Sequence, residues 1–200
     1  AGDLGSPGAQ GPACGGGMTG DGMCLDGGVP RAIVYPQAGD LVINEWMPNP
    51  SGTDTDAEWF EVYVSAPVDL NELQLSRYTA ATGVFAVQGT LASADCLAVP
   101  AGTHVLFARD LDPLVNGGLP PVDFAFTFSL NNSDAGIAVG VADVHLDEVL
   151  YASATDGSAT QLDPAAQTPA GNDDAGNLCP ATAPYGAGGN GTPGAANPAC

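Results

Sequence analysis

The feature that most limits the fold is a series of short apolar runs, between residues 40 and 178, in which hydrophobic and polar residues alternate. A period of two residues is typical of β-strands, because successive side chains point to opposite faces of a sheet. No segment repeats its apolar residues with the period of a convincing amphipathic helix. The pattern therefore predicts an all-β fold. The runs cover residues 41–46, 58–64, 73–76, 83–88, 96–99, 104–109, 123–128, 136–141, 144–152 and a short stretch around 161–162.

Turn-forming residues separate the runs. Proline, glycine, asparagine and serine gather at residues 48–52, 116–118 and 131–134, and such clusters mark reversals of the chain. Many short strands at near-regular spacing are typical of two sheets packed face to face, so the sequence predicts a β-sandwich.

The composition divides the chain into three parts, which are an N-terminal arm or linker (1–38), the sandwich (39–178) and a Gly/Pro-rich C-terminal tail that closes the domain (179–200). In the arm, glycine recurs every third residue from Gly2 to Gly11, which is the collagen period over too short a length for a triple helix. The arm is either a flexible linker or an extended strand that packs against copies of itself, since glycine permits close backbone approach.

The charge excludes several classes of function. The chain has 23 Asp and Glu against only three arginines and no lysine, and its net charge is −20. Nucleic acid and anionic membrane surfaces would be repelled. Chemistry that requires lysine, such as a P-loop or a Schiff base, is excluded. No apolar run is long enough for a transmembrane helix, so no membrane insertion is expected.

The five cysteines, Cys14, Cys24, Cys96, Cys179 and Cys200, form no CxxC motif and no Cys/His zinc spacing. They indicate disulfides in an exported protein, secreted or at the cell surface. No signal peptide is present, and Ala1 is a plausible first residue of a processed chain. Proximity in the sequence favours a Cys14–Cys24 bridge, with one pair among the other three cysteines and one cysteine left over.

Acidic residues gather near one end of the predicted strand pair 41–47 and 58–64. Strict alternation places Glu45 and Glu58 on the inward face beside the connecting loop, which carries Asp54 and Asp56. Four carboxylates so close together repel one another unless a cation neutralises them, and Ca²⁺ is the expected ion. The alternative is that these acids cap backbone N–H groups of the loop, half in solvent.

Aromatic residues mark the other face of the same pair, where alternation places Trp46, Trp59 and Tyr63. Exposed there, they would form a binding surface or a subunit contact. The alternative is that the tails or a longer loop cover them.

Catalysis finds little support. The sequence has no Gly-x-Ser-x-Gly elbow and no HExxH motif, and its two histidines, His104 and His145, lie in predicted strands without a triad pattern. Paired carboxylates such as Glu45 and Glu58 could in principle perform glycoside hydrolysis, but acid pairs are common in so acidic a chain. We expect the protein not to be an enzyme.

Several motifs together resemble the lamin-tail domain family, in its bacterial, secreted branch. The resemblance covers roughly residues 38–200 and implies an immunoglobulin-like β-sandwich, appended as a non-catalytic module to exported proteins of the kind found on the surface of myxobacteria. One departure is Leu178, where this branch often carries tryptophan before the cysteine. The motifs lie at residues 41–50 (LVINEWMPNP), 56–63 (DAEWFEVY), 68–71 (VDLN), 99–102 (VPAG), 104–108 (HVLFA), 128–132 (FSLNN), 147–151 (DEVLY), 179–186 (CPATAPYG) and 191–197 (GTPGAAN).

These observations predict a secreted, non-catalytic structural protein that self-assembles, with a filament as one form, or attaches to a surface. Its expected partner is a second copy of itself, contacted through the N-terminal arm or through exposed sheet edges. The alternative is a Ca²⁺-dependent module that binds carbohydrate or another surface ligand.

Overall fold

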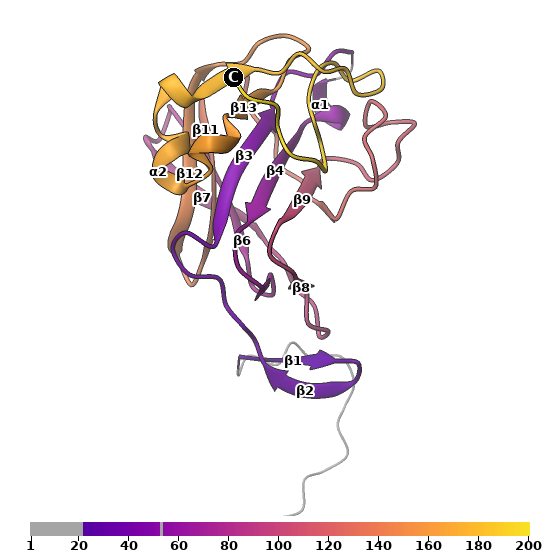
Figure 1. The fold of residues 1–200 in the computed structure, drawn as a ribbon, viewed down its shortest axis with the longest axis vertical. Coiled ribbons are helices and arrows are strands. Elements are labelled where there is room, and N and C mark those ends of the chain that lie inside the picture. Colours follow the sequence, from indigo (N-terminus) through magenta and orange to yellow (C-terminus); the bar gives the residue numbers. More distant parts are fainter. Residues whose placement is uncertain (1–21, 53) are drawn as a thin grey trace, which may run out of the picture.

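The computed structural model describes residues 22–52 and 54–200. Strands make up most of its regular structure, which confirms the all-β prediction (Figure 1). The strands are β1 (Met23–Asp26), β2 (Val29–Ala32), β3 (Leu41–Met47), β4 (Trp59–Val64), β5 (Val68–Asp69), β6 (Gln74–Thr79), β7 (Val84–Thr90), β8 (Ala98–Val99), β9 (Thr103–Ala108), β10 (Phe124–Ala125), β11 (Ser133–Val141), β12 (Val144–Ser153), β13 (Thr160–Leu162) and β14 (Leu178–Pro180). The helices are short: α1 (Asp54–Ala57), α2 (Pro169–Asn172) and the 3₁₀ turns η1 (Pro164–Ala166) and η2 (Ala175–Asn177).

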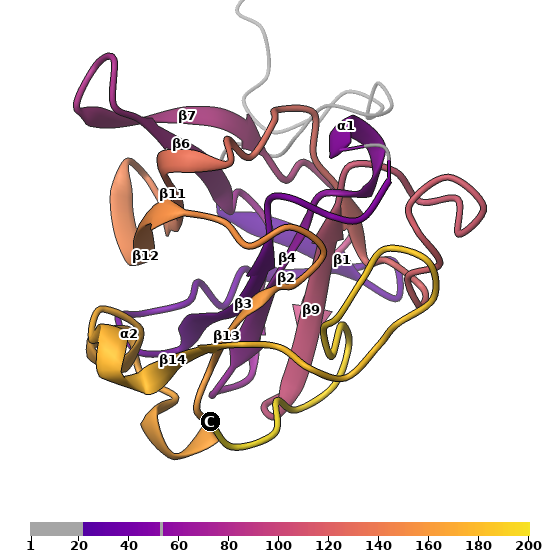
Figure 2. The same cartoon turned by 90° about the horizontal axis from the view of Figure 1, so that it is seen from above.

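Two larger sheets dominate the fold. One has six strands in the order β10-β9-β4-β3-β13-β14, and the other has four in the order β12-β11-β6-β7. Neighbouring strands are antiparallel except for β10, which runs parallel to β9. Seen from above in Figure 2, the two sheets lie face to face, so the fold is sandwich-like.

The main core fills the space between these sheets. Phe60 and Phe107 stack with ring centroids 4.8 Å apart on the six-stranded side, and Ile137 and Val139 project from β11 on the other. All four side chains are buried. Their alternation with outward residues is the period that the sequence showed.

A β-bulge in β3 changes which residues face this core. Ile43 pairs with Val62, but Trp46 pairs with Phe60, so Asn44 is an extra residue in the strand. The bulge reverses the alternation beyond it. Trp46 therefore joins the core and Glu45 faces the opposite way, which corrects the prediction that Glu45 points inward and Trp46 outward.

The C-terminal segment covers the outer face of the six-stranded sheet, on the side away from β6 and β7 (Figure 2). Met47, Trp59 and Leu106 on that face pack with Ala181 and Tyr185 of the segment in a second buried cluster. This sheet is thus buried on both faces, which explains why every residue of β3 is buried.

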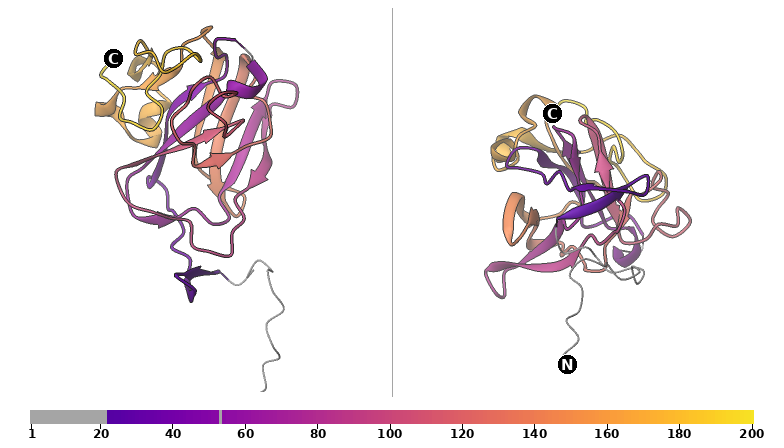
Figure 3. Two further views of the ribbon diagram at one scale, coloured as in Figure 1. Left: turned by 90° about the vertical axis from the view of Figure 1, so that its right-hand side faces the viewer. Right: turned by 90° about the horizontal axis from the view of Figure 1, so that it is seen from below.

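An N-terminal hairpin lies at the opposite pole from Cys200 (Figures 1 and 3). β1 and β2 are joined by Gly27 and Gly28, both with positive φ, which is the geometry of a type I′ turn. The Cys24–Cys96 disulfide fastens the hairpin to the domain. Arg31 adds a two-pronged ion pair with Asp69, at 2.5 and 2.8 Å.

Each predicted run coincides with a strand, although several bounds shift by a few residues. The sequence interpretation missed β1, β2, β5 and β14. Residues 22–38 of the predicted arm thus contain a folded hairpin, and the glycine triplets lie outside the described residues. In residues 22–52 and 54–200, none of the helices has the length and apolar character that crossing a membrane requires.

Candidate functional site

The four predicted metal ligands do not gather at one point. Glu45 lies on the outer face of the six-stranded sheet, whereas Glu58 shares the inward side of Phe60. Glu58 Oε2 accepts hydrogen bonds from Arg109 Nη1 and the backbone N–H of Leu130, both at 3.0 Å. The charge that a cation was expected to neutralise is therefore compensated by an arginine from the end of β9.

Asp54 and Asp56 lie in α1, apart from Glu45. Asp54 Oδ2 accepts a hydrogen bond from Asn132 Nδ2 at 3.1 Å, and Asp56 Oδ1 accepts one from Thr55 at 3.5 Å. Within the described residues, the one group of three or more metal-ligating side chains with ligand atoms inside 4.8 Å is Cys24, Asp69 and Cys96. Its sulfurs bond to each other, so they are not free ligands.

Burial of the Glu58 side chain changes its pKa. Desolvation raises the pKa of Glu58 to about 7, against the hydrogen bond from Leu130 and the charge of Arg109. Burial likewise raises the pKa of Asp147 to about 7, although Ile43 N and Asn172 Nδ2 both donate to its Oδ2.

The predicted aromatic surface is not exposed. Trp46 is 1% exposed and stacks on Tyr151 in the core, so its assignment to an open surface is wrong. Trp59 is fully buried, and its Nε1 donates to Tyr185 Oη at 2.8 Å. For Trp59 the alternative is confirmed, because the C-terminal segment covers it. Tyr63 alone remains partly exposed, beside His104.

The disulfides differ from the expected pairing. Cys24 bonds to Cys96 across 72 residues, which contradicts the predicted Cys14–Cys24 bridge. Cys179 bonds to Cys200, so a pair does form among the last three cysteines. Cys14 lies outside the described residues.

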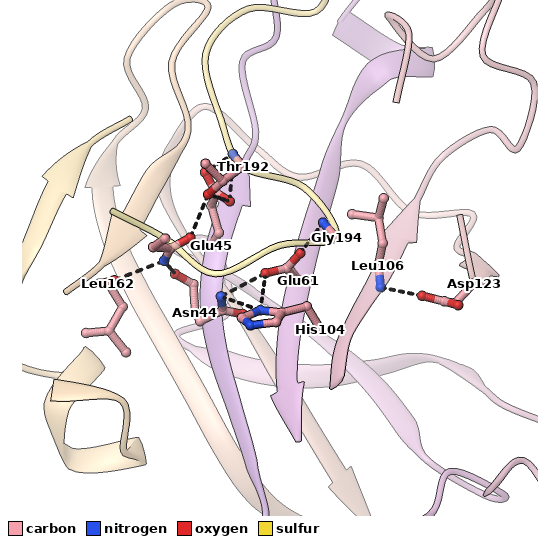
Figure 4. Close-up of polar contacts among 10 residues, drawn as sticks. Asn44, Glu45, Glu61, His104, Leu106, Asp123, Leu162, Thr192 and Gly194 are labelled. Carbon is pink, nitrogen blue, oxygen red and sulfur yellow. Dashed lines mark hydrogen bonds and ion pairs between the residues drawn. The ribbon is translucent and has the colours of Figure 1, made fainter. Parts of the chain in front are cut away.

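A buried acidic cluster occupies the outer face of the six-stranded sheet (Figure 4). Glu45 and Glu61 are cross-strand partners, and both are fully buried. Glu61 Oε1 accepts a hydrogen bond from Asn44 Nδ2 at 2.8 Å and lies 2.8 Å from His104 Nδ1, and Gly194 N donates to Oε2.

Residues 191–197 lie over this cluster as a strap. Thr192 N donates to both carboxyl oxygens of Glu45, at 3.0 and 3.1 Å. Asn197 Nδ2 donates to the carbonyl oxygens of Asn44 and Leu162, at 2.8 and 2.9 Å, and so fills the gap that the bulge opens between β3 and β13. Burial, reinforced by the charge of Glu61, raises the pKa of Glu45 to about 8, and the bonds from Thr192 oppose the rise.

Sequence reasoning missed the strap residues Thr192, Gly194 and Asn197, together with Glu61 and His104. The signal was present in the motif GTPGAAN at 191–197, which carries part of the family resemblance but was given no contacts with the strands. Its glycines permit close approach, since a Cβ on Gly191 would lie 2.7 Å from Trp59 Cζ2.

Strand β7 is the second candidate site, because it ends the four-stranded sheet. No charged side chain occurs from Tyr78 to Ala94. Val84 and Val87 are 58% and 45% exposed. A groove of about 210 Å³ lies between the end of the strand and the neighbouring segment, with Gly89 and Phe128 among its lining residues.

The other edges of the two larger sheets are short or protected. β10 and β14 have two and three residues, and β14 contains Pro180. β12 is longer but carries Asp147 and Glu148, and α2 packs against it. Short edges, charges and covering elements are ordinary protections against edge pairing. β7 has seven mostly exposed residues and is neither short nor charged.

β7 has one partial protection of its own. Its pairing with β6 contains a bulge at Gln88, and the Gln88 amide donates to the carbonyl oxygens of Ala86 and Val87 at 3.1 and 3.4 Å. Adjacent carbonyls of a strand point to opposite sides, so release of this side chain would free one of the two for a partner strand.

The histidines show no catalytic arrangement. His104 Nδ1 contacts Glu61 and Asn44, and His145 Nδ1 contacts Glu148 at 2.6 Å. Among the hydrogen bonds of the described residues, neither imidazole contacts a serine, threonine or cysteine. Of the two described sites, the Glu45 and Glu61 cluster holds the strap on the sheet by hydrogen bonds, and β7 presents an open strand edge.

Comparison of the sequence and structure with protein-family models, with curated proteins and with solved structures gives no match.

Proposed function

We propose that this chain is a non-catalytic structural module of an exported protein, and that it associates with copies of itself through the edge of β7. The observation that carries the proposal is an exposed, uncharged strand whose outer edge pairs with no other strand of the described residues, in a chain of net charge −20. Backbone pairing between edge strands is an established mode of association, since it satisfies open N–H and C=O groups.

Charge determines where two copies can meet. Surfaces rich in Asp and Glu repel one another when almost no lysine or arginine is available for cross-pairing. The surface of β7 contributes no charge, so two copies approach there with the least repulsion. Pairing β7 with β7 would extend one four-stranded sheet into a continuous sheet across both molecules.

Disulfides support the expected location. Two disulfides in so small a chain indicate an oxidising environment. We infer that the protein works outside the cell or at its surface.

We also propose that the sandwich is of the immunoglobulin-like, lamin-tail type. Three of the sequence motifs that carry this resemblance meet in space, because Glu45 of the first and Glu61 of the second both bind the strap at 191–197. The three motifs therefore act together to hold the strap on the sheet. The predicted calcium ligands lie on two faces and Glu58 pairs with Arg109, so no observation favours the calcium-dependent alternative.

The proposal is tested by sedimentation velocity of the full chain over a range of concentrations. We expect Val84→Lys combined with Val87→Lys to weaken association at least about tenfold, because the lysines place charge on both faces of the edge strand. The matched control is Leu114→Lys combined with Val115→Lys, on an exposed loop.

Both double variants add the same positive charge to an acidic protein, so general repulsion falls equally in each. Association that is lost only in the β7 variant supports the proposal. A wild-type chain that stays monomeric at every concentration would contradict the function, and equal behaviour of the two variants would contradict the assignment to β7.

A further inference from the structure

The hydrogen bonds of the strap determine the direction in which the Thr192 hydroxyl donates its proton. Thr192 Oγ1 is 3.0 Å from Glu45 Oε2 and 2.8 Å from Asn197 Oδ1 (Figure 4 shows Thr192 against Glu45). Both neighbours are oxygen atoms. A threonine hydroxyl has one proton, so it donates to one of them and must accept from the other.

The orientation of the Asn197 amide decides between them. Its Nδ2 donates to the carbonyl oxygens of Asn44 and Leu162. The reversed amide would set its oxygen against these two carbonyls, so the observed orientation is the one that satisfies them. Asn197 Oδ1 therefore has no proton to give, and the Thr192 hydroxyl donates to it.

It follows that Thr192 Oγ1 turns its lone pair toward Glu45 Oε2. A carboxylate there would bring two acceptors together at 3.0 Å, whereas a carboxylic acid would donate the missing proton. The backbone N–H of Thr192 remains free to donate to Oε1 of the same group.

The surroundings of Glu45 favour the neutral form. Its cross-strand neighbours are Glu61 on β4 and Gln161 on β13. Asn44 Nδ2 and Gly194 N donate to Glu61, and His104 Nδ1 on β9 lies 2.8 Å from its Oε1. The charge of Glu61 opposes ionisation of Glu45. Tyr185 is the other titratable group near Glu45. The chain has no charged side chain from Ala175 to Cys200, so the strap brings no cation to Glu45 and Glu61.

We propose that the strap is a proton-held latch, in which neutral Glu45 donates to Thr192 Oγ1 and loss of that proton releases residues 191–197 from the sheet. Deprotonation would place a second negative charge beside Glu61 in a site closed to water, and it would oppose two acceptor oxygens. Release would uncover the side of Trp59 that Gly191 approaches closely. The latch does not depend on the proposed association through β7.

Glu45→Gln tests the latch directly. A glutamine amide has the shape of the protonated acid, and it can donate to Thr192 Oγ1 and accept from Thr192 N at every pH. The measurement is hydrogen exchange of the Thr192 and Gly194 amides by NMR between pH 5 and 9, corrected for the intrinsic pH dependence of exchange.

In the wild type we expect protection of these amides to fall by about tenfold per pH unit as Glu45 ionises. In Glu45→Gln the protection should stay at its pH 5 level throughout. The matched control, Glu58→Gln, removes a buried acid on the inward side and should keep the wild-type response.

Loss of strap protection in Glu45→Gln at pH 5, or an unchanged pH response in that variant, would overturn the latch. If Glu45→Gln does not fold, the side-chain carboxyl ¹³C resonances of the wild type give the answer. A glutamate that titrates near pH 8 in both the wild type and Glu58→Gln supports the latch, and the absence of such a resonance contradicts it.

Discussion

At the scale of single residues, the strap depends on a glycine that allows its close approach to the sheet. A Cβ on Gly191 would lie 2.7 Å from Trp59 Cζ2 and 3.2 Å from Glu45 Oε1. We expect Gly191→Ala to lower the free energy of unfolding by about 1–3 kcal/mol, because both neighbours are buried and cannot move aside. Urea denaturation measures the change.

Gly89→Ala is the control, since a Cβ there meets nothing within 4 Å and the residue has no positive φ. We expect a change within about 0.5 kcal/mol. Equal effects of the two substitutions would show that the strap does not lie as close to Trp59 as described.

Gln88 offers a substitution that should strengthen association. Its amide binds the carbonyls of Ala86 and Val87. Adjacent carbonyls of a strand point to opposite sides, so Gln88→Ala leaves one of the two open to a partner strand. We expect self-association to tighten by about two- to tenfold, measured by sedimentation velocity. Gln37→Ala is matched, because Gln37 is exposed and its amide also binds nearby carbonyls, of Tyr35 and Pro36. An equal increase in self-association in both variants would contradict the proposed contact through the edge of β7.

Alternation predicted the faces of β4 correctly and failed in β3 at a single residue. Leu41 and Ile43 face the core as expected, but the bulge at Asn44 exchanges Glu45 and Trp46. Nothing in the local pattern marks this bulge. Its support comes from Asn197, 153 residues away, which binds the carbonyl of Asn44. The partner of Glu58 is likewise remote, since Arg109 lies 51 residues further on.

At the scale of elements, the two disulfides should differ in their contribution to stability. Cys24–Cys96 spans 72 residues and Cys179–Cys200 spans 21. Loop closure in the unfolded chain restricts a longer loop more, so replacing the first pair by alanine should cost about 1 kcal/mol more than replacing the second. Urea denaturation in a Cys14→Ser background, which removes thiol exchange with Cys14, measures both. A larger loss from the second pair would contradict this ranking.

Strands with strong period-two patterns were predictable because the signal is local. The hairpin β1–β2 was missed although Asp26-Gly27-Gly28-Val29 is a typical two-residue turn, because the glycine-rich composition favoured an arm. The cysteine pairing could not be found by proximity. Cys24 and Cys96 meet because the chain from Leu25 to Asp95 returns to its start, where Leu25 bonds to Ala94.

At the scale of the whole molecule, buried acids predict an unusual dependence of stability on pH. Burial raises the pKa of Glu45 to about 8 and those of Glu58 and Asp147 to about 7. Each group binds its proton more tightly in the folded state than in the unfolded chain. Their contribution is therefore complete below the unfolded pKa, near 4, and is lost as the pH rises through 7 and 8.

We expect the melting temperature to be at least about 5 °C lower at pH 9 than at pH 5, measured by circular dichroism. Asp69 acts in the opposite sense, because the hydrogen bond from Arg31 lowers its pKa, and so its contribution is lost only in stronger acid. A melting temperature that rises from pH 5 to pH 9 would contradict the raised pKa values of these three acids.

Net charge predicts how association responds to salt. Copies that each carry a charge of −20 repel over about 30 Å at 0.01 M salt and over about 8 Å at 0.15 M. Pairing through an uncharged edge gains no charge attraction that salt could weaken. Association should therefore strengthen with added NaCl in sedimentation experiments, and weakening would indicate an interface of opposite charges instead of β7.

The sequence predicts the sandwich-like class but not the layer that the last residues add to it. Residues 181–197 contain few apolar side chains, and their glycines and prolines are typical of a loose tail. They are fixed by hydrogen bonds to Glu45, Glu61 and Asn44, which come from the first part of the domain. Such contacts follow from the three-dimensional fold, so composition alone misassigns the segment.

The positions of the two disulfides determine how the protein would bear a mechanical load. The hairpin and Cys200 lie at opposite poles (Figure 1), so tension applied between them runs along the length of the domain. A pull on Cys200 passes through its sulfur to Cys179, and the strap between them carries none of it. A pull entering at Cys24 is shared with Cys96, and the 72 residues between them cannot extend. The segment that a single proton holds in place is thus shielded from force, and the stretchable length falls mainly between Cys96 and Cys179.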